Sequence, residues 1–305
     1  MPHRRCTLKH RHNSVVSHRC RTGGRLLHIP LGHGARVTKR PRKPSGSNGV
    51  SPPSAPAWPS APTQPTGGGI APWFDGSFAC GCISGTLYPY QSFISGHVAV
   101  VPNPTGGGQD VLKFAVADSD RPYAGATSPR ADIESPPVFK PGDDDYISIP
   151  VLVPTTVPAT STWFNLAEIY GKPYGGSPPV SFGLSDVGES GQNHFVMNQD
   201  ATNGYKRAWT GPPATDGQWH TITFHVNFET NNTGSVQIYF DGQLQALANG
   251  TTTLNEATLD PGVNWDGTHA NFLDIQSYRS AGSFPGTVTT YAGAPRFGTT
   301  LASTQ

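Results

Sequence analysis

Two side chains that can exchange protons, Glu168 and Tyr170, stand two residues apart in the run 163–170. Aromatic and apolar residues dominate this run, and a Gly/Pro-rich segment follows it, which is typical of a strand that ends in a loop. Because successive side chains of a strand point to opposite faces, Glu168 and Tyr170 are predicted to share one face, with Ala167 and Ile169 on the other. The sheet would then present a carboxyl and a phenol side by side.

Two other predicted strands, 130–134 and 272–279, repeat this arrangement. In each of them polar or aromatic side chains occupy every second position, and most positions between them are apolar. If the three strands are neighbours in one sheet, these side chains line an open polar and aromatic groove. They are Arg130, Asp132 and Glu134 in the first strand and Asp274, Gln276 and Tyr278 in the second.

The composition of the whole chain indicates an all-β fold. Its 305 residues include 36 Gly and 30 Pro, only 13% are charged, and no long amphipathic helix is predicted. Frequent breakers that separate short alternating runs are typical of a β-sandwich, and we expect a jelly roll. The clearest of these runs are 111–116, 146–153, 180–184, 219–228 and 236–240.

Charge and composition divide the chain into three parts. Residues 1–43 hold 12 of the 21 Lys and Arg residues and none of the 20 acids, and we expect a disordered basic arm there. Residues 44–69 form a Pro/Ser/Gly-rich linker, and the folded domain is expected at 70–305. Nucleic acid is not an expected partner of this chain, except non-specifically through the basic arm.

Several segments follow one another in the order found in a known family. They are 103–108 with 112–114, Arg130-Ala131-Asp132-Ile133, 163–171, Gly217-Gln218-Trp219-His220 with Asp241-Gly242-Gln243, and 274–279 with 295–300. Over about residues 72–300 the chain resembles the concanavalin A-like jelly-roll polysaccharide lyases, in particular the heparin lyase I-like family, and more distantly the alginate and glucuronan lyases. The resemblance implies cleavage of a uronic-acid-containing polysaccharide by β-elimination.

β-Elimination needs a group that neutralises the sugar carboxylate, a base for the adjacent C–H and an acid for the departing oxygen. Arg130 is the candidate for neutralising the carboxylate or for activating a phenol. Tyr170 and Tyr278 would share the proton transfers, with Gln276 and His194 as supporting donors.

The chain departs from the family at catalytic positions. Glu168 and Tyr170 replace the family's Gln-x-His pair, Asp274 replaces a Lys four residues before Tyr278, and Glu134 replaces a second Arg. These acids repel a polyanion. They also permit a glycoside hydrolase in which Glu168 acts with Asp274 or Glu134. Such an enzyme needs its two carboxyl groups about 5–5.5 Å apart for retention of configuration or about 6.5–9.5 Å apart for inversion.

A third interpretation is a non-catalytic, lectin-like domain that binds carbohydrate through aromatic and amide side chains in its loops. Of these three functions the sequence favours the lyase, and the lectin-like domain and the glycoside hydrolase are the alternatives. The residues expected to contact a polysaccharide are Asp132, Tyr174, His194, Tyr205, Lys206, Arg207, Trp209, Asp274 and Gln276.

No cofactor is required by these interpretations, although the acidic run 143–145 suggests structural calcium as an alternative to a solvated turn. Cys80 and Cys82 are predicted to be small buried thiols, because neighbours on one face of a strand do not easily bridge each other. We expect a monomer without a membrane span, located outside the cell or at its surface. The arm nevertheless lacks the apolar core of a secretory signal.

Overall fold

The computed structural model describes residues 21–22, 25–26 and 72–305, except for 73, 79, 89, 93–95, 122–125, 172–176, 202–203 and 260–270. At 21–22, 25–26, 90–92, 200–201 and 204–205 it describes only the backbone. The chain divides into two units, Met1–Ala55 and Pro56–Gln305. In the first unit only the paired strands β1 (Arg21–Thr22) and β2 (Arg25–Leu26) are described. The predicted arm and linker otherwise lie outside the described residues.

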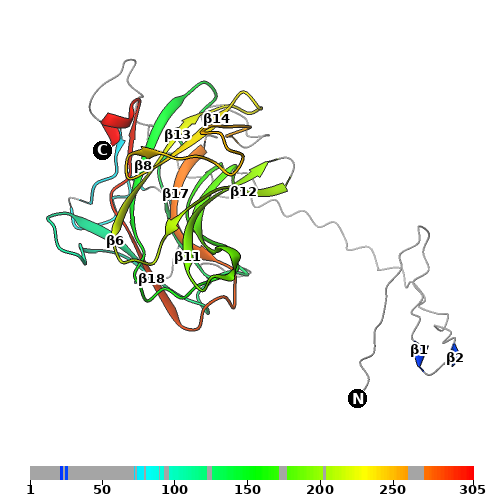
Figure 1. Cartoon of the computed structure of the whole chain (residues 1–305). Coiled ribbons are helices and arrows are strands. Elements are labelled where there is room, and N and C mark those ends of the chain that lie inside the picture. The colour runs from blue at the N-terminus through cyan, green and yellow to red at the C-terminus, as the bar shows by residue number, and fades with distance from the viewer. Residues whose placement is uncertain are drawn as a thin grey trace, which may run out of the picture. The chain divides into compact units, whose positions relative to one another are not determined.

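The unit Pro56–Gln305 consists of two antiparallel sheets that stack face to face (Figure 1). We call the first the groove sheet; its strands have the order β12-β11-β10-β9-β17-β7-β4. Their bounds are β4 (Tyr90–Ser92), β7 (Arg130–Glu134), β9 (Phe164–Gly171), β10 (Val180–Asp186), β11 (Asn193–Ala201), β12 (Gly204–Pro213) and β17 (Asn271–Arg279).

The second sheet, the back sheet, has the order β15-β14-β13-β8-β18-β6-β5. In addition, β16 pairs with β14, and β19 pairs with β8 and β3. Its strands are β3 (Phe74–Asp75), β5 (Val98–Pro102), β6 (Asp110–Ala117), β8 (Asp144–Leu152), β13 (Trp219–Asn227), β14 (Ser235–Phe240), β15 (Gln243–Leu244), β16 (Leu254–Asn255), β18 (Thr287–Ala292) and β19 (Arg296–Gly298). The described helices are two short 3-10 turns, η1 (Val187–Glu189) and η2 (Leu301–Thr304). No helix in the described part of the chain is long and apolar enough to span a membrane.

The core lies between the sheets, and alternation along the strands builds it. In β13 the side chains of Ile222, Phe224 and Val226 are buried in the core cluster, as the sequence predicts. β13 pairs with β8 along its whole length, from Trp219 opposite Leu152 to Asn227 opposite Asp144. Burying a large apolar side chain contributes about 1.5–3 kcal/mol, so one apolar face on each strand suffices to hold the sheets together. The predicted all-β sandwich is confirmed.

The three strands expected to carry the groove are neighbours, in the order β9-β17-β7. Ala167 and Ile169 of β9 belong to the buried core, as do Leu273 and Ile275 of β17. The polar positions between these residues must therefore lie on the opposite face of the sheet, where they can form a site.

The structure corrects the prediction for the cysteines. Cys80 and Cys82 form a disulfide, with their Cα atoms 5.1 Å apart. The two residues lie in an exposed turn and not in a strand. Gly81 between them adopts φ +63°, and its amide donates a hydrogen bond to the carbonyl of Phe78. The strand assumed in the prediction does not exist here, so its geometric objection to a mutual bridge does not apply.

The acidic run 143–145 does not converge on one site. Asp143 is buried and accepts a hydrogen bond from the amide of Lys140, while Asp144 is exposed and pairs with His225 at 2.8 Å. Asp145 is fully buried in β8. Among the described residues no group of three or more His, Cys, Asp or Glu side chains could hold a metal ion.

Candidate active site

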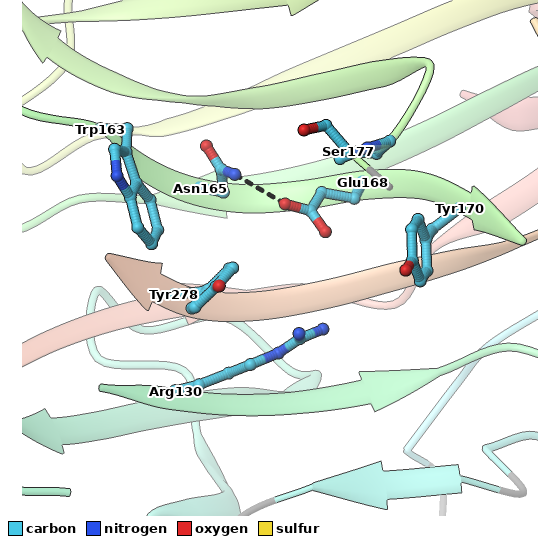
Figure 2. Close-up of a pocket in the computed structure, with 8 residues that line it drawn as sticks. Arg130, Trp163, Asn165, Glu168, Tyr170, Ser177 and Tyr278 are labelled. Carbon is cyan, nitrogen blue, oxygen red and sulfur yellow. Dashed lines mark hydrogen bonds between the residues drawn. The ribbon is translucent and has the colours of Figure 1, made fainter. Parts of the chain in front are cut away.

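A cavity of about 450 Å³ lies on the open face of the groove sheet, over β7, β17 and β9. We call it the first cavity. Figure 2 shows that its side chains come from different strands and point toward one another. They are Arg130, Trp163, Asn165, Glu168, Tyr170, Ser177, Pro178 and Tyr278.

The pairing register of β7, β17 and β9 determines which charged residues lie in the cavity and which lie in the sheet beneath it. We call the buried residues Asp132, Glu134, Asp274 and Gln276 the floor of the cavity. Tyr278 of β17 lies opposite Arg130 of β7. Asp274 lies opposite Glu168 of β9 on one side and Glu134 of β7 on the other. Directly opposed side chains in antiparallel strands have Cβ atoms about 4.5–5.5 Å apart, so this row of acids crosses the sheet at contact distance.

An irregularity of β9 brings Asn165 to the face that carries Glu168. In a regular strand residues three apart point to opposite faces. The pairing of β9 with β10 shifts by one residue between Phe182 and Gly183, and the side-chain amide of Asn165 donates a hydrogen bond of 2.6 Å to Glu168 Oε1. Gly183 permits the close approach, because a Cβ atom there would lie 1.9 Å from the carbonyl oxygen of Phe164.

Arg130 connects the floor of the cavity to its aromatic wall. Its Nη2 donates to Asp274 Oδ2 at 2.5 Å, and its Nε forms an ion pair with Asp132. Its Cζ lies 4.6 Å from the ring centroid of Tyr278, a cation–π contact. The side chain is 21% exposed, so it can also reach a ligand.

Burial dominates the protonation of the acids. Burial raises the pKa of Glu168, which is 5% exposed, although the charge of Arg130 and the amides of Asn165 and Gln276 oppose the shift. Burial raises the pKa of Asp274 well above its usual range, Asp132 adds to the shift, and Arg130 opposes it. Burial alone would lower the pKa of Arg130, but the charges of Asp274 and Asp132 outweigh that effect and raise it.

The carboxyl groups of Asp274, Asp132 and Glu168 therefore surround one permanent cation, the guanidinium of Arg130. Each carboxylate favours the charge of Arg130 and disfavours the charges of its neighbours. The acid nearest to a ligand, Glu168, keeps its proton to a higher pH than an ordinary glutamate.

The aromatic wall is held by ring contacts. The ring of Trp163 meets that of Tyr278 edge to face, with centroids 4.6 Å apart. Tyr170 contacts Phe272 edge to face at 5.9 Å. In Figure 2 the two tyrosines stand on either side of Glu168, with Arg130 between them below. This places two phenols, one carboxyl and one guanidinium around a single space.

The structure brings together four of the predicted residues, namely Arg130, Glu168, Tyr170 and Tyr278. Asp132, Asp274 and Gln276, expected to contact substrate, are buried and do not line the first cavity. They share the face of the sheet that carries Arg130 and Tyr278, and Asp132 and Asp274 form ion pairs with Arg130 there.

Four cavity residues were not predicted as site residues: Trp163, Asn165, Ser177 and Pro178. Strict alternation places Asn165 and Glu168 on opposite faces of the strand, so the sequence pattern does not identify Asn165 as a site residue. Trp163 directly precedes β9, and a tryptophan at the end of a strand with polar alternation is the signal that could have identified it.

The prediction that Trp209 stacks on a sugar is wrong. Trp209 lies in β12 and is 2% exposed, because its ring belongs to the core and contacts Phe240. His194 lines neither the first cavity nor its floor, and its Nδ1 lies 2.9 Å from the carbonyl of Gly211. Tyr174 and the side chain of Tyr205 lie outside the described residues.

Lys206 and Arg207 are both exposed in β12 but differ in their surroundings. The charge of Lys206 acts on Glu256, a buried acid whose pKa burial raises to about 8. Arg207 lines a second cavity on the groove sheet.

The geometry offers little to a glycoside hydrolase. Glu168 is the one carboxylate among the described residues that line the first cavity. Its proposed partners, Asp274 and Glu134, are 0% and 3% exposed and lie in the same row of the sheet floor. A glycosidase needs two carboxyl groups that flank the scissile bond, and of these three acids Glu168 alone lines the cavity.

The family model described as polysaccharide lyase matches residues 83–272, more than half of the chain. Among curated protein sequences, none matches this chain.

Solved structures with a similar architecture include an endo-β-1,4-glucuronan lyase from the fungus Trichoderma reesei. It is 16% identical, with a TM-score of 0.53 over 77% of this chain and 98% of that one. An alginate lyase from Pseudomonas aeruginosa is 14% identical, with a TM-score of 0.42 over 67% and 87% of the two chains. The cellulose-induced protein Cip1 is 12% identical, with a TM-score of 0.48 over 74% and 97%.

The first of these likenesses shows the same fold, and the family match covers the strands of the groove sheet except β17, in which it ends at residue 272. The chain therefore belongs to the polysaccharide lyase family and has a polysaccharide lyase-like function.

Proposed function

We propose that the first cavity cleaves a uronic-acid-containing polysaccharide by β-elimination, with Arg130, Glu168, Tyr170 and Tyr278 in contact with the sugar. One observation carries the assignment. The guanidinium of Arg130 lies against the ring of Tyr278 in a cavity that also holds a buried, readily protonated carboxyl, Glu168.

Tyr278 is the proposed base. The guanidinium carbon of Arg130 lies 4.6 Å from the centre of its ring, and a cation at this distance stabilises the phenolate over the phenol. Arg130 keeps its charge at every pH of interest, since the acids beneath it raise its pKa. The pair thus places a potential phenolate in a partly enclosed space.

Glu168 takes the place of the amide that the family commonly carries. A neutral carboxylic acid has one O–H donor, so it can hydrogen-bond to a sugar carboxylate where an ionised glutamate would repel it. Burial raises the pKa of Glu168, and Asn165 holds the carboxyl in position at 2.6 Å. This answers the objection that acids in the groove exclude a polyanion.

The reaction balances with these groups. Tyr278 removes the proton from the carbon next to the sugar carboxylate, and the electron pair of that C–H bond forms a carbon–carbon double bond. The bond to the glycosidic oxygen breaks, and Tyr170 donates a proton to that oxygen. One proton exchange with water then restores both tyrosines. Proton transfer by a positioned side chain contributes about 100-fold to 10,000-fold in rate.

The proposed place of action is outside the cell or at its surface. Polysaccharides of this class lie outside cells, and the Cys80–Cys82 disulfide forms and persists in oxidising compartments.

Tyr278→Phe tests the proposal. We expect turnover of the cleaved polysaccharide to fall about 100-fold or more while binding is retained, because the substitution removes only the hydroxyl. Tyr291→Phe is the matched control, since Tyr291 lies in β18 of the back sheet, and it should leave the rate unchanged. A Tyr278→Phe protein with the wild-type rate would remove Tyr278 from the mechanism. Binding without turnover in the wild-type protein would favour the lectin-like alternative.

A further inference from the structure

A second cavity of about 360 Å³ lies on the groove sheet, over β9, β10, β11 and β12. Trp163 lines both cavities, so the indole stands where they meet. The lining residues of the second cavity are Ser161, Thr162, Trp163, Phe164, Leu184, Ser185, Val196, Asn198, Arg207 and Ser280. A polymer that enters the first cavity thus meets a second hollow beside it.

The second cavity contains a buried polar group without a partner. Asn198 of β11 is 4% exposed, and its side-chain oxygen has no hydrogen-bond partner. A buried acceptor without a partner costs about 1–3 kcal/mol, so a ligand hydroxyl that donates to it is favoured. The amide lines the cavity and can meet such a hydroxyl there.

Arg207 gives the second cavity its charge. It lies opposite Asn198 in the pairing of β12 with β11, and it is exposed. Arg207 is the charged side chain among the described residues that line this cavity. The second cavity therefore presents a cation to an anionic ligand.

We propose that the second cavity is the subsite for the uronate next to the one that is cleaved. Arg207 binds the carboxylate of that sugar, Asn198 accepts a hydrogen bond from one of its hydroxyls, and Trp163 separates it from the reacting unit. This inference rests on the proposed function, because it takes the first cavity as the place of cleavage. It assigns the preference for consecutive uronates to Arg207.

The chain supplies a matched control in Lys206. It is exposed, adjacent to Arg207 in β12, and carries the same charge. Its register partner is Gln199, it acts on Glu256, and it lines neither cavity. Lys206→Gln and Arg207→Gln therefore change the net charge equally, but only the second alters the proposed subsite.

The test measures binding by calorimetry in the full chain carrying Tyr278→Phe. The probes are hexasaccharides of glucuronan and alginate, and the same hexasaccharides with their carboxyl groups reduced to alcohols. For the acidic probe that binds, Arg207→Gln should weaken binding about tenfold, as expected for the loss of a charged hydrogen bond, and Lys206→Gln should change it less than twofold. Arg207→Gln should not affect binding of the reduced probe.

Asn198→Ala provides the complementary pattern. Because its proposed contact is to a hydroxyl, this substitution should weaken binding of the acidic and the reduced probe alike, by about fivefold. Equal losses for Arg207→Gln and Lys206→Gln, no loss for Arg207→Gln, or no binding of either acidic probe would overturn the subsite. Turnover that survives in Tyr278→Phe would instead overturn the proposed proton transfer, so the two failures are distinguishable.

Discussion

The two cavities of the groove sheet share Trp163 but handle charge in opposite ways. Beneath the first cavity the acids are buried, and Arg130 compensates two of them at short range. Arg207, which lines the second cavity, is exposed. The first region holds its charges in the interior of the protein, and the second presents a cation at the surface.

This difference separates chemistry from recognition within one sheet. Buried charges shift pKa values strongly and are costly to disturb, because removing one partner leaves the other uncompensated. An exposed arginine contributes little to folding and can be exchanged without loss of the scaffold. We therefore expect substitutions at the first cavity to affect stability and rate, and substitutions at the second to affect binding alone.

The largest effect is expected at Arg130. Arg130→Met leaves Asp132 and Asp274 buried without a cation, which should lower the free energy of unfolding by about 3–5 kcal/mol at neutral pH and abolish turnover. Urea denaturation measures the first and the lyase assay the second. Arg207→Met, at an exposed position, should cost about 0.5 kcal/mol or less. A similar loss in both variants would contradict the contrast between the cavities.

A smaller effect is expected where the strand irregularity positions the carboxyl. In Gly183→Ala the new methyl would meet the carbonyl oxygen of Phe164, so β9 must shift, and Asn165 with it. We expect a loss of about 1–3 kcal/mol and a reduced rate. Gly85→Ala, where nothing lies within 4 Å, serves as the control and should remain within about 0.5 kcal/mol of the wild type. Unfolding curves of the two variants that coincide would show that the close approach is not required.

Glu168→Gln should change the pH dependence of kcat/KM more strongly than it changes the rate at low pH. Burial raises the pKa of Glu168 above its ordinary value of 4.5, so the folded protein holds this proton in a window above pH 4.5 where the unfolded chain has released it. Stability from this group is therefore lost as the pH rises through that window, and the active, neutral form is lost with it.

Glutamine stays neutral at all pH values, so the decline of kcat/KM with rising pH that belongs to Glu168 should disappear in Glu168→Gln. Steady-state kinetics across the pH range would show this, with Glu256→Gln as a control for a buried acid outside both cavities. An unchanged descending limb in Glu168→Gln would mean that Glu168 does not act as a neutral donor.

Alternation in the sequence predicts much of this site, because each central strand buries one apolar face. Glu168, Tyr170 and Tyr278 follow from that pattern, and so does the groove, once β9, β17 and β7 are neighbours. Local periodicity does not encode the order of strands in a sheet. The sequence therefore predicts the groove only if these three strands are neighbours.

The remaining parts depend on features that no periodic pattern carries. Asn165 reaches the site through a shift of register, which depends on how closely two strands can approach at Gly183. Trp209 resembles a sugar-binding aromatic residue in the sequence, but β12 turns its ring into the core. The compensation of Arg130 by acids from β7 and β17 is visible only after the strands are paired.

The most direct test of the account is the product that the full chain forms from polyuronates. The protein is mixed with alginate, glucuronan, heparin and pectate, and near-ultraviolet absorbance is followed together with reducing ends. β-Elimination leaves a carbon–carbon double bond conjugated to the carboxylate, so we predict absorbance that rises in step with new reducing ends on at least one polymer. New reducing ends without absorbance would show hydrolysis and would contradict the assignment of the first cavity.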